Sequence, residues 1–419
     1  MSRTVPADFA ARCGWYDVSG QSLLLCQVPE SSFGEPMILV SSDDRVERFY
    51  AVDAAHLRGD DGTMLDLDAL ERSSRYLEEH VRFGAGSVQL AGTIITPATP
   101  GRHPAVVFVH GAAGGQRDFN RLFAGPFLDA GVAVPIYDKA GHGLSEGTEP
   151  TIFDQRDAAW AALDLLASRS DVDAARIGLA GFSNGMWSVP MVAARRSDVA
   201  FVVGIGSPGV SMAQSEEHRR VKVLREAGVS EPTLVAVARA WRCVFAIVAA
   251  GTAGAAMIAD LEEELAKVAQ FADLNRYPVP GYARENPMLS PIPPLLPVDD
   301  LVQMLSGDPA PELMHDPMLD YANFNCPVFL QFGAEDTSVP VDASVERITN
   351  VLQEAAVPHT ILVYPDLEHL LNVVPPDLPG ASREAVLYAF HDFRFGEGVR
   401  QDLADWLTHH LQRPSARNR

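Results

Sequence analysis

One pentapeptide, Gly181-Phe182-Ser183-Asn184-Gly185, constrains the fold of this chain more than any other stretch. It follows a short apolar run, residues 176–180, that we expect to form a buried strand, and it precedes residues 186–194, which can start a helix. A chain that passes from strand to helix within so few residues must turn sharply, with the serine at the strained position. Glycines are needed two residues to either side, because side chains there would collide with the neighbouring strand or helix. The pattern therefore predicts a strand–turn–helix unit that presents Ser183 Oγ above the edge of a sheet.

The chain around this turn alternates between apolar strands and helices from about residue 80 onward. Continuous apolar runs predict strands buried on both faces, and segments with helical periodicity lie between them. The expected strands are residues 81–83, 88–96, 105–109, 132–137, 201–206, 327–333 and 360–364, and the expected helices are residues 119–130, 152–168 and 400–411. Pro135 lacks an N–H group, so we expect a bulge in its strand. This alternation predicts an α/β fold with a mostly parallel sheet, helices on both faces and right-handed crossovers.

Two parts of the chain do not follow the alternation. Short β-type runs near the N-terminus predict a small antiparallel sheet, and residues 66–79 predict a helix that leads onward. After residue 210 the pattern predicts helices and proline-rich loops, which would form a cap over Ser183. The β-type runs are residues 21–28, 36–40 and 46–50, and the cap helices are residues 215–227, 231–249 and 255–271. The expected divisions are 1–80 for an N-terminal β-rich domain, 81–209 and 319–412 for the core, 210–318 for the cap and 413–419 for a tail.

The composition limits the partners and cofactors. A formal net charge of −22 argues against DNA, RNA or an anionic membrane surface, because these require basic patches. The four cysteines are scattered, so neither a metal site nor a disulfide framework is expected. Residues 1–8 lack the apolar segment of a secretory signal, which favours a cytoplasmic protein. Lysine is scarce among the basic residues, a bias that we attribute to genomic composition, and the lysines are Lys139, Lys222 and Lys267.

The stretch Cys243–Ala259 contains no charged residue. A membrane span requires ~20 apolar residues, and this stretch is shorter and contains Gly251 and Gly254. The pattern favours a buried pair of cap helices over a membrane-contacting segment. This stretch or the N-terminal sheet offers an interface for a homodimer.

Five motifs in order carry a resemblance to a known family. They are HGAAGG at 110–115, DKAGHGLS at 138–145, GFSNG at 181–185, GAEDTSVP at 333–340 and PDLEH at 365–369. Over roughly residues 80–412 the chain resembles α/β-hydrolases, in which a serine, an acid after a later strand and a histidine after the last strand follow in this order. The finer resemblance is to bacterial serine carboxylesterases with a helical cap and a small N-terminal β domain, relatives of dienelactone hydrolases and S9 peptidases.

The resemblance and the chemistry together assign roles to five residues. Ser183 Oγ is the expected nucleophile, His369 accepts and returns its proton, and Asp336 orients the imidazole and stabilises its charged form. Glu335 is an alternative acid, although the family pattern favours Asp336. The expected oxyanion hole consists of the backbone amides of Ala112 and Asn184, where one donor is worth on the order of 3 kcal/mol in the transition state.

Other residues in or near these motifs have expected supporting roles. We expect His110 to hydrogen-bond and shape the oxyanion loop, His142 to be structural, and Lys139 to anchor its loop through an ion pair. Three aromatic side chains are candidates for an acyl pocket, with ordinary core packing as the alternative for each of them: Trp187, Trp241 and Phe245.

The leading hypothesis is a serine hydrolase that cleaves a carboxylic ester of a small-molecule acyl substrate through an acyl-enzyme, without a metal or organic cofactor. A second hypothesis is acyl transfer, thioester cleavage or lactone formation on a biosynthetic intermediate, if a cap excludes water. A peptidase is a third possibility, although the 80 N-terminal residues are too few for the propeller of S9 peptidases. A non-catalytic binding scaffold on the same fold is the alternative from a different class.

Overall fold

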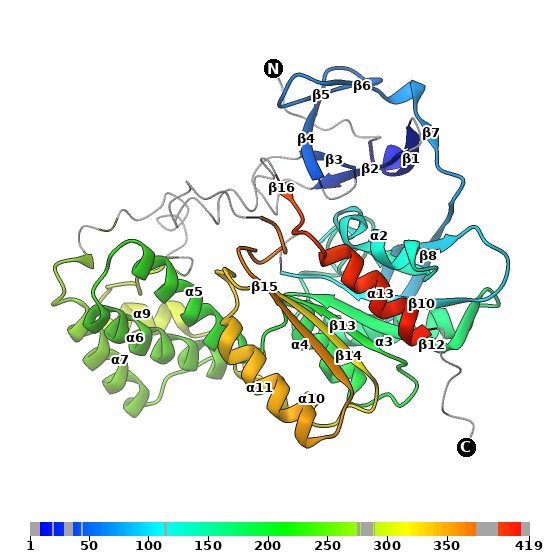
Figure 1. Cartoon of the computed structure of the whole chain (residues 1–419). Helices are drawn as coiled ribbons and strands as arrows, with labels where there is room; N and C mark the ends of the chain where they lie inside the picture. Colours follow the sequence, from blue (N-terminus) through cyan, green and yellow to red (C-terminus); the bar gives the residue numbers. More distant parts are fainter. Residues whose placement is uncertain are drawn as a thin grey trace.

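The computed structural model of the 419-residue chain describes residues 9–18, 21–28, 37–42, 45–112, 115–274, 277, 288, 290–373 and 393–411. These ranges form an N-terminal sheet, a central α/β core and a separate group of helices (Figure 1). The predicted tail over residues 413–419 lies outside the described residues. Strands and helices alternate through the core, as predicted.

The core is built on one twisted sheet. Its parallel part has the strand order β10-β12-β13-β14-β15, and a bridge between Ala105 and Ala133 joins it to the antiparallel strands β11-β9-β8. The strands are β8 (Tyr76–Ala85), β9 (Val88–Pro97), β10 (His103–Val109), β11 (Val134–Tyr137), β12 (Val172–Phe182), β13 (Val202–Ile205), β14 (Val328–Gly333) and β15 (His359–Tyr364). The carboxyl ends of the parallel strands therefore share one edge, where loops from distant parts of the sequence meet.

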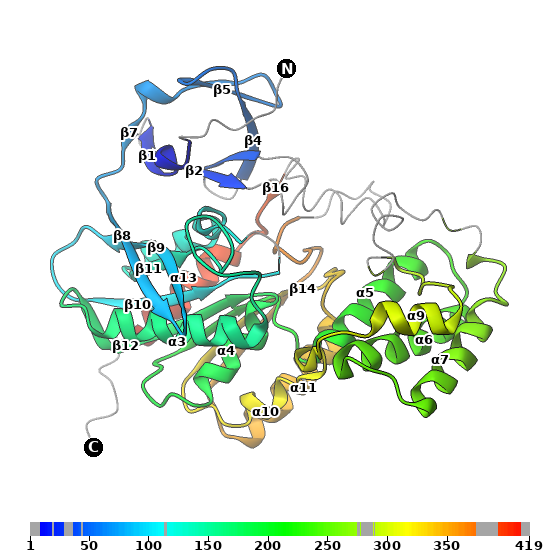
Figure 2. The same cartoon turned by 180° about the vertical axis from the view of Figure 1, so that it is seen from behind.

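Helices cover both faces of this sheet, and the alternation along β10 shows why. Val106 and Phe108 belong to the apolar core under α2 (Arg121–Asp129) and α13 (Val399–Leu411). The neighbouring residues of β10 point to the opposite core. Its helices are α3 (Ile152–Ala167), α4 (Gly185–Ala193), α10 (Met318–Tyr321) and α11 (Val341–Glu354). Figure 1 shows α13 in front of the sheet, and Figure 2 shows α3 and α4 in front from the reverse side. A strand with an apolar side chain at every position requires both covers.

The N-terminal part is an antiparallel sheet with the order β6-β5-β4-β3-β2-β1-β7, and β16 near the C-terminus adds to β4. Its strands are β1 (Gly14–Val18), β2 (Gln21–Val28), β3 (Met37–Ser42), β4 (Arg45–Ala51), β5 (His56–Gly59), β6 (Met64–Asp66), β7 (Glu71–Arg72) and β16 (Phe393–Arg394), with the 3₁₀-helices η1 (Phe9–Arg12) and η2 (Leu67–Ala69). The short β-type runs near the N-terminus therefore form an antiparallel sheet, as predicted. This sheet packs against α2 and the preceding 3₁₀-helix η3 (Arg117–Asn120).

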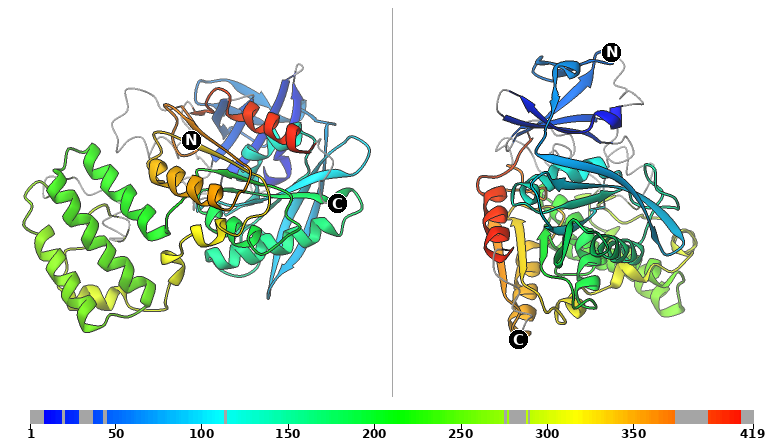
Figure 3. Two further views of the ribbon diagram at one scale, coloured as in Figure 1. Left: turned by 60° about the horizontal axis from the view of Figure 1, so that its bottom comes forward. Right: turned by 90° about the vertical axis from the view of Figure 1, so that its right-hand side faces the viewer.

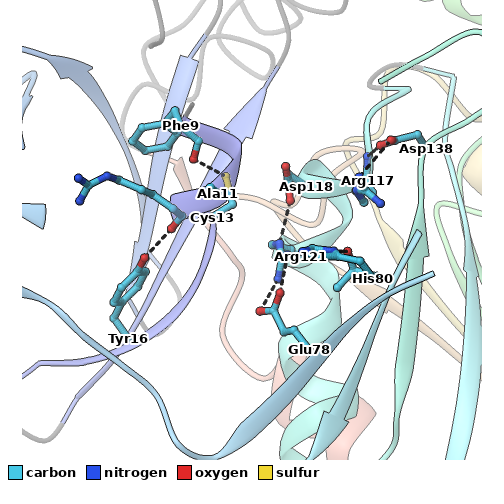
Figure 4. Close-up of polar contacts among 12 residues, drawn as sticks. Phe9, Ala11, Cys13, Tyr16, Glu78, His80, Arg117, Asp118, Arg121 and Asp138 are labelled. Carbon is cyan, nitrogen blue, oxygen red and sulfur yellow. Dashed lines mark hydrogen bonds and ion pairs between the residues drawn. The ribbon is translucent and has the colours of Figure 1, made fainter. Parts of the chain in front are cut away.

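A buried arginine joins the N-terminal sheet to the core. The guanidinium of Arg121 is 3% exposed and donates to both carboxylate oxygens of Glu78 at 2.9 Å and to Asp118 Oδ1 at 2.9 Å (Figure 4). It also lies 5.4 Å from the ring centre of Trp15, on β1. Because the positive charge is shared by two carboxylates and an aromatic face, it is compensated despite its burial.

Two expectations about secondary structure were wrong. Residues 66–79 are not a helix but contain η2, β7 and the start of β8, because ten residues of β8 pair with β9 in an unbroken antiparallel register. The core sheet therefore begins at Tyr76, before the expected boundary at residue 81. Pro135 causes no bulge, since its pairing with Ile94 is in continuous register. Backbone N–H groups alternate in direction along a strand, so the position where Pro135 lacks its N–H faces β10. The pairing with β10 is limited to the bridge at Ala133, so no ladder hydrogen bond is lost.

The segment from residue 212 to 305 forms the predicted group of helices, here called the helical insertion. Its helices are α5 (Met212–Glu226), α6 (Glu231–Ala250), α7 (Ala255–Val268) and α9 (Val298–Leu305), and η6 (Pro311–Met314) leads back to the core. They enclose an apolar core of their own and lie beside α11 (Figure 3). By length and composition, α6 is the one helix among the described residues that could cross a membrane, but 56% of its apolar window is buried, as in a core helix.

Candidate active site

The predicted turn at Ser183 has the expected strained geometry. β12 ends at Phe182, α4 begins at Gly185, and Ser183 between them has a φ of 50°, which is unusual for a residue other than glycine. A Cβ on Gly185 would lie 2.5 Å from the carbonyl oxygen of Val109, and one on Gly181 would lie 2.7 Å from the sulfur of Met186. The two glycines therefore allow the turn to pack against β10 and its own helix.

Three residues from separate loops meet at this turn. His369 Nε2 lies 2.8 Å from Ser183 Oγ, and His369 Nδ1 lies 2.7 Å from Asp336 Oδ2. His369 and Asp336 are both 2% exposed, whereas Ser183 is partly accessible. Asp336 Oδ1 accepts hydrogen bonds from the amides of Ser338 and Val339, at 2.7 and 2.8 Å. The carboxylate is thereby fixed, the imidazole is held by it, and the hydroxyl is in reach of a base.

Glu335, the alternative acid, is not in this arrangement. Its amide donates to Leu367 O at 3.0 Å and its carbonyl accepts from Lys222, and the oxygen 2.7 Å from His369 Nδ1 belongs to Asp336.

The expected oxyanion donors lie beside the turn. Asn184 is the first residue after Ser183, and Ala112 follows the end of β10, whose last carbonyls contact Gly185. Within the described residues, the amides of Ala112 and Asn184 donate to no other protein group. The remainder of the HGAAGG motif includes Ala113 and Gly114, which lie outside the described residues.

Two side chains hold the loop that contains Ala112. Lys139 Nζ donates to the carbonyl oxygen of Ala112 at 3.0 Å and lies 3.8 Å from Glu149 Oε1, so it forms the expected ion pair and also a loop contact. Burial of the ammonium lowers the pKa of Lys139. His110 is fully buried and hydrogen-bonds to the carbonyl oxygen of Tyr137 and to the amide of Asn120. His142 hydrogen-bonds to Glu149.

The three candidates for an acyl pocket lie in apolar clusters, in line with the alternative of core packing, and Phe245 also lines a cavity beside α5 and α6. Trp187 is 6% exposed, donates from Nε1 to Val210 O at 2.8 Å and packs in a small apolar cluster at the start of α3. Trp241 and Phe245 stack at 5.3 Å inside the core of the helical insertion, and Trp241 is fully buried. A fully buried ring presents no surface to an acyl group.

Two contributors to the site escaped the sequence analysis. Glu368, next to His369, accepts hydrogen bonds from the backbone and the hydroxyl of Thr337 and so connects the histidine loop to the acid loop. Lys222 on α5 donates to the carbonyl oxygens of Glu335 and Asp336, at 2.9 Å each. Two features of the sequence could have pointed to these residues. Glu368 lies inside the PDLEH motif, and Lys222 is one of only three lysines in the chain.

No metal centre is formed in the described part of the chain, where no three His, Cys, Asp or Glu side chains gather as possible ligands. The four cysteines carry free thiols. What the described residues offer chemically is therefore a hydroxyl beside a carboxylate-oriented imidazole, with the amide of Asn184 following directly in the chain.

Comparison with protein families divides the chain at the helical insertion. Residues 85–252, which include Ser183, match the model of the X-Pro dipeptidyl-peptidase (S15) family. Residues 310–386, which include Asp336 and His369, match the dienelactone hydrolase family. Both are families of hydrolytic enzymes. The first match covers β9 to β13 of the core and also α5 and α6 of the helical insertion, and the second covers β14 and β15. The chain belongs to the α/β-hydrolase superfamily.

Several solved structures are similar to this α/β-hydrolase. An esterase from Pyrococcus furiosus is 15% identical with a TM-score of 0.48, over 80% of this chain and 91% of the esterase. A putative dienelactone hydrolase from Klebsiella pneumoniae is 13% identical with a TM-score of 0.44, over 81% and 99% of the two chains. A 2,6-dihydroxy-pseudo-oxynicotine hydrolase is 16% identical with a TM-score of 0.43, over 80% and 68%. A search of the curated proteins finds no match.

Proposed function

We propose that this α/β-hydrolase is a serine hydrolase that cleaves a carboxylic ester through an acyl-enzyme. The observation that carries the proposal is the chain of two hydrogen bonds from Ser183 Oγ through His369 to Asp336, at 2.8 and 2.7 Å. A hydroxyl becomes a nucleophile when a neighbouring imidazole takes its proton, and the imidazole does so when a carboxylate holds its other nitrogen.

The proposed reaction has two stages. Ser183 Oγ attacks the ester carbonyl while His369 Nε2 takes the hydroxyl proton, and His369 then returns this proton to the departing alcohol as the ester C–O bond breaks. Water attacks the acyl-enzyme in the same manner and releases the acid. The amides of Ala112 and Asn184 would bind the oxyanion, and each is available because no other described group accepts from it.

The test is hydrolysis of p-nitrophenyl esters, from acetate to decanoate, by the wild type and by Ser183→Ala. We expect turnover by the wild type and its loss in the variant, together with covalent labelling of Ser183 by a fluorophosphonate probe. Turnover that persists in Ser183→Ala would refute the proposal. Labelling of Ser183 without turnover of any ester would redirect it to acyl transfer onto an acceptor other than water.

A further inference from the structure

The scarce lysines of this chain have an uneven distribution over the structure. Lys139 Nζ binds the carbonyl oxygen of Ala112, and Lys222 Nζ binds the carbonyl oxygens of Glu335 and Asp336. The third, Lys267, pairs on α7 with two glutamates of its own helix and is 39% exposed. Two of the three lysines thus hold the backbone of loops that flank Ser183.

The chemistry of the ammonium group accounts for this use. An ammonium directs three donors tetrahedrally from one atom and can bind two carbonyl oxygens that lie close together, whereas the planar guanidinium fork matches a carboxylate. Arginine makes most of the ion pairs with carboxylates in the described part of the chain, for example Arg121 with Glu78 and Arg242 with Glu217. At position 222, where a single atom donates to two neighbouring carbonyl oxygens, the chain has lysine.

Lys222 completes the hydrogen bonding of Asp336. One carboxylate oxygen of Asp336 faces His369, the other accepts from two amides of the following turn, and the backbone carbonyl accepts from Lys222. Lys222 comes from a different part of the fold, since α5 is the first helix of the helical insertion. A second hydrogen bond, between uncharged groups, also joins α5 to the loop of Asp336: Ser215 Oγ donates to the carbonyl oxygen of Ser338 at 2.9 Å.

We propose that Lys222 is a positioning residue for the reaction at Ser183. It fixes the loop that carries Asp336, so that docking of α5 sets the alignment of Asp336 with His369. The inference rests on the proposed function. Lys222 contacts backbone carbonyls and neither the imidazole nor the nucleophile, so its loss displaces the acid without removing a reacting group. A displacement of about 1 Å in such a site lowers the rate by up to ~100-fold.

The experiment compares Lys222→Met, Lys222→Arg and the matched control Lys267→Met in p-nitrophenyl acetate hydrolysis, with active sites counted by fluorophosphonate titration. We expect Lys222→Met to lower kcat by roughly 10- to 100-fold with KM within about twofold of the wild type. Lys222→Arg keeps the charge and the donors and should recover part of kcat, and Lys267→Met should be unchanged. If the wild type turns over no ester, the rate of probe labelling replaces kcat.

Several outcomes would overturn the role of Lys222. These are a wild-type kcat in Lys222→Met or a defect confined to KM. Ser215→Ala removes the uncharged link of α5 to the same loop, and it measures how much kcat is lost when the helix is held less firmly. If kcat falls as much in Ser215→Ala as in Lys222→Met, Lys222 only attaches α5 and does not itself position Asp336. Ser183→Ala separates the two proposals: if it is inactive while Lys222→Met is fully active, only the role of Lys222 fails.

Discussion

Glu368 supplies a prediction that can be worked out from its surroundings. The residue precedes His369, is 1% exposed and accepts hydrogen bonds from Thr337. Burial, and next the charge of Asp336, raise the pKa of this carboxyl from its usual 4.5 to about 7. The folded state therefore binds the proton more tightly than the unfolded state. The resulting stabilisation is fully present below pH 4.5 and is lost as the pH rises through 7.

The magnitude follows from the size of the shift. A difference of about 2.5 pKa units corresponds to ~3 kcal/mol, at about 1.4 kcal/mol per unit. Of this amount, about 2 kcal/mol disappears between pH 5.5 and 8. In Glu368→Gln the amide oxygen still accepts from Thr337 and nothing titrates. The free energy of unfolding of Glu368→Gln minus that of the wild type should therefore increase by about 2 kcal/mol as the pH rises from 5.5 to 8.

The assay is urea unfolding of both proteins at pH 5.5, 6.5, 7.25 and 8, followed by tryptophan fluorescence. Titrating groups that do not interact with residue 368 are common to the two proteins, so they cancel in the difference between the free energies of unfolding. Glu354→Gln, at an exposed position at the end of α11, is the matched control and should give a curve parallel to that of the wild type. A constant difference between Glu368→Gln and the wild type would refute the reasoning.

Three further predictions concern the turn, the acid and the buried arginine. Asp336→Asn can donate to His369 Nδ1 and fix the wrong tautomer, so kcat should fall by about 10⁴-fold in ester hydrolysis, and a loss below tenfold would contradict the proposed role. Gly185→Ala places a Cβ 2.5 Å from a carbonyl of β10, so it should cost about 1–3 kcal/mol in thermal unfolding. Arg121→Met leaves two carboxylates without their partner and should cost ~3–5 kcal/mol in urea unfolding; a loss under 1 kcal/mol would contradict this account.

Much of the fold could be predicted from local pattern. Continuous apolar runs identified the parallel strands, and helical periodicity identified α3, α5, α6 and α13, because each element is determined by its own spacing of apolar residues. The pattern failed over residues 66–79. There the choice between helix and strand depended on pairing with β9, which lies later in the chain.

The candidate site divides in the same manner. The order of motifs nominated Ser183, Asp336 and His369, and the structure places their side chains within hydrogen-bond distance. The same reasoning left the place of Trp241 and Phe245 open, because an aromatic residue in a helix has the same pattern in a pocket as in a core. Which face of a helix is enclosed depends on the neighbouring helices.

By itself, the sequence determined the strained turn at Ser183 and the alternation that builds a parallel sheet, because backbone geometry and the period of apolar residues act over a few neighbouring positions. Only the tertiary structure decided that Lys222 binds the loop of Asp336 and that Glu368 binds Thr337. These contacts join residues 31 to 114 positions apart. Their partners are set by how the helical insertion and the loops dock at the carboxyl edge of the sheet, and no local pattern encodes that docking.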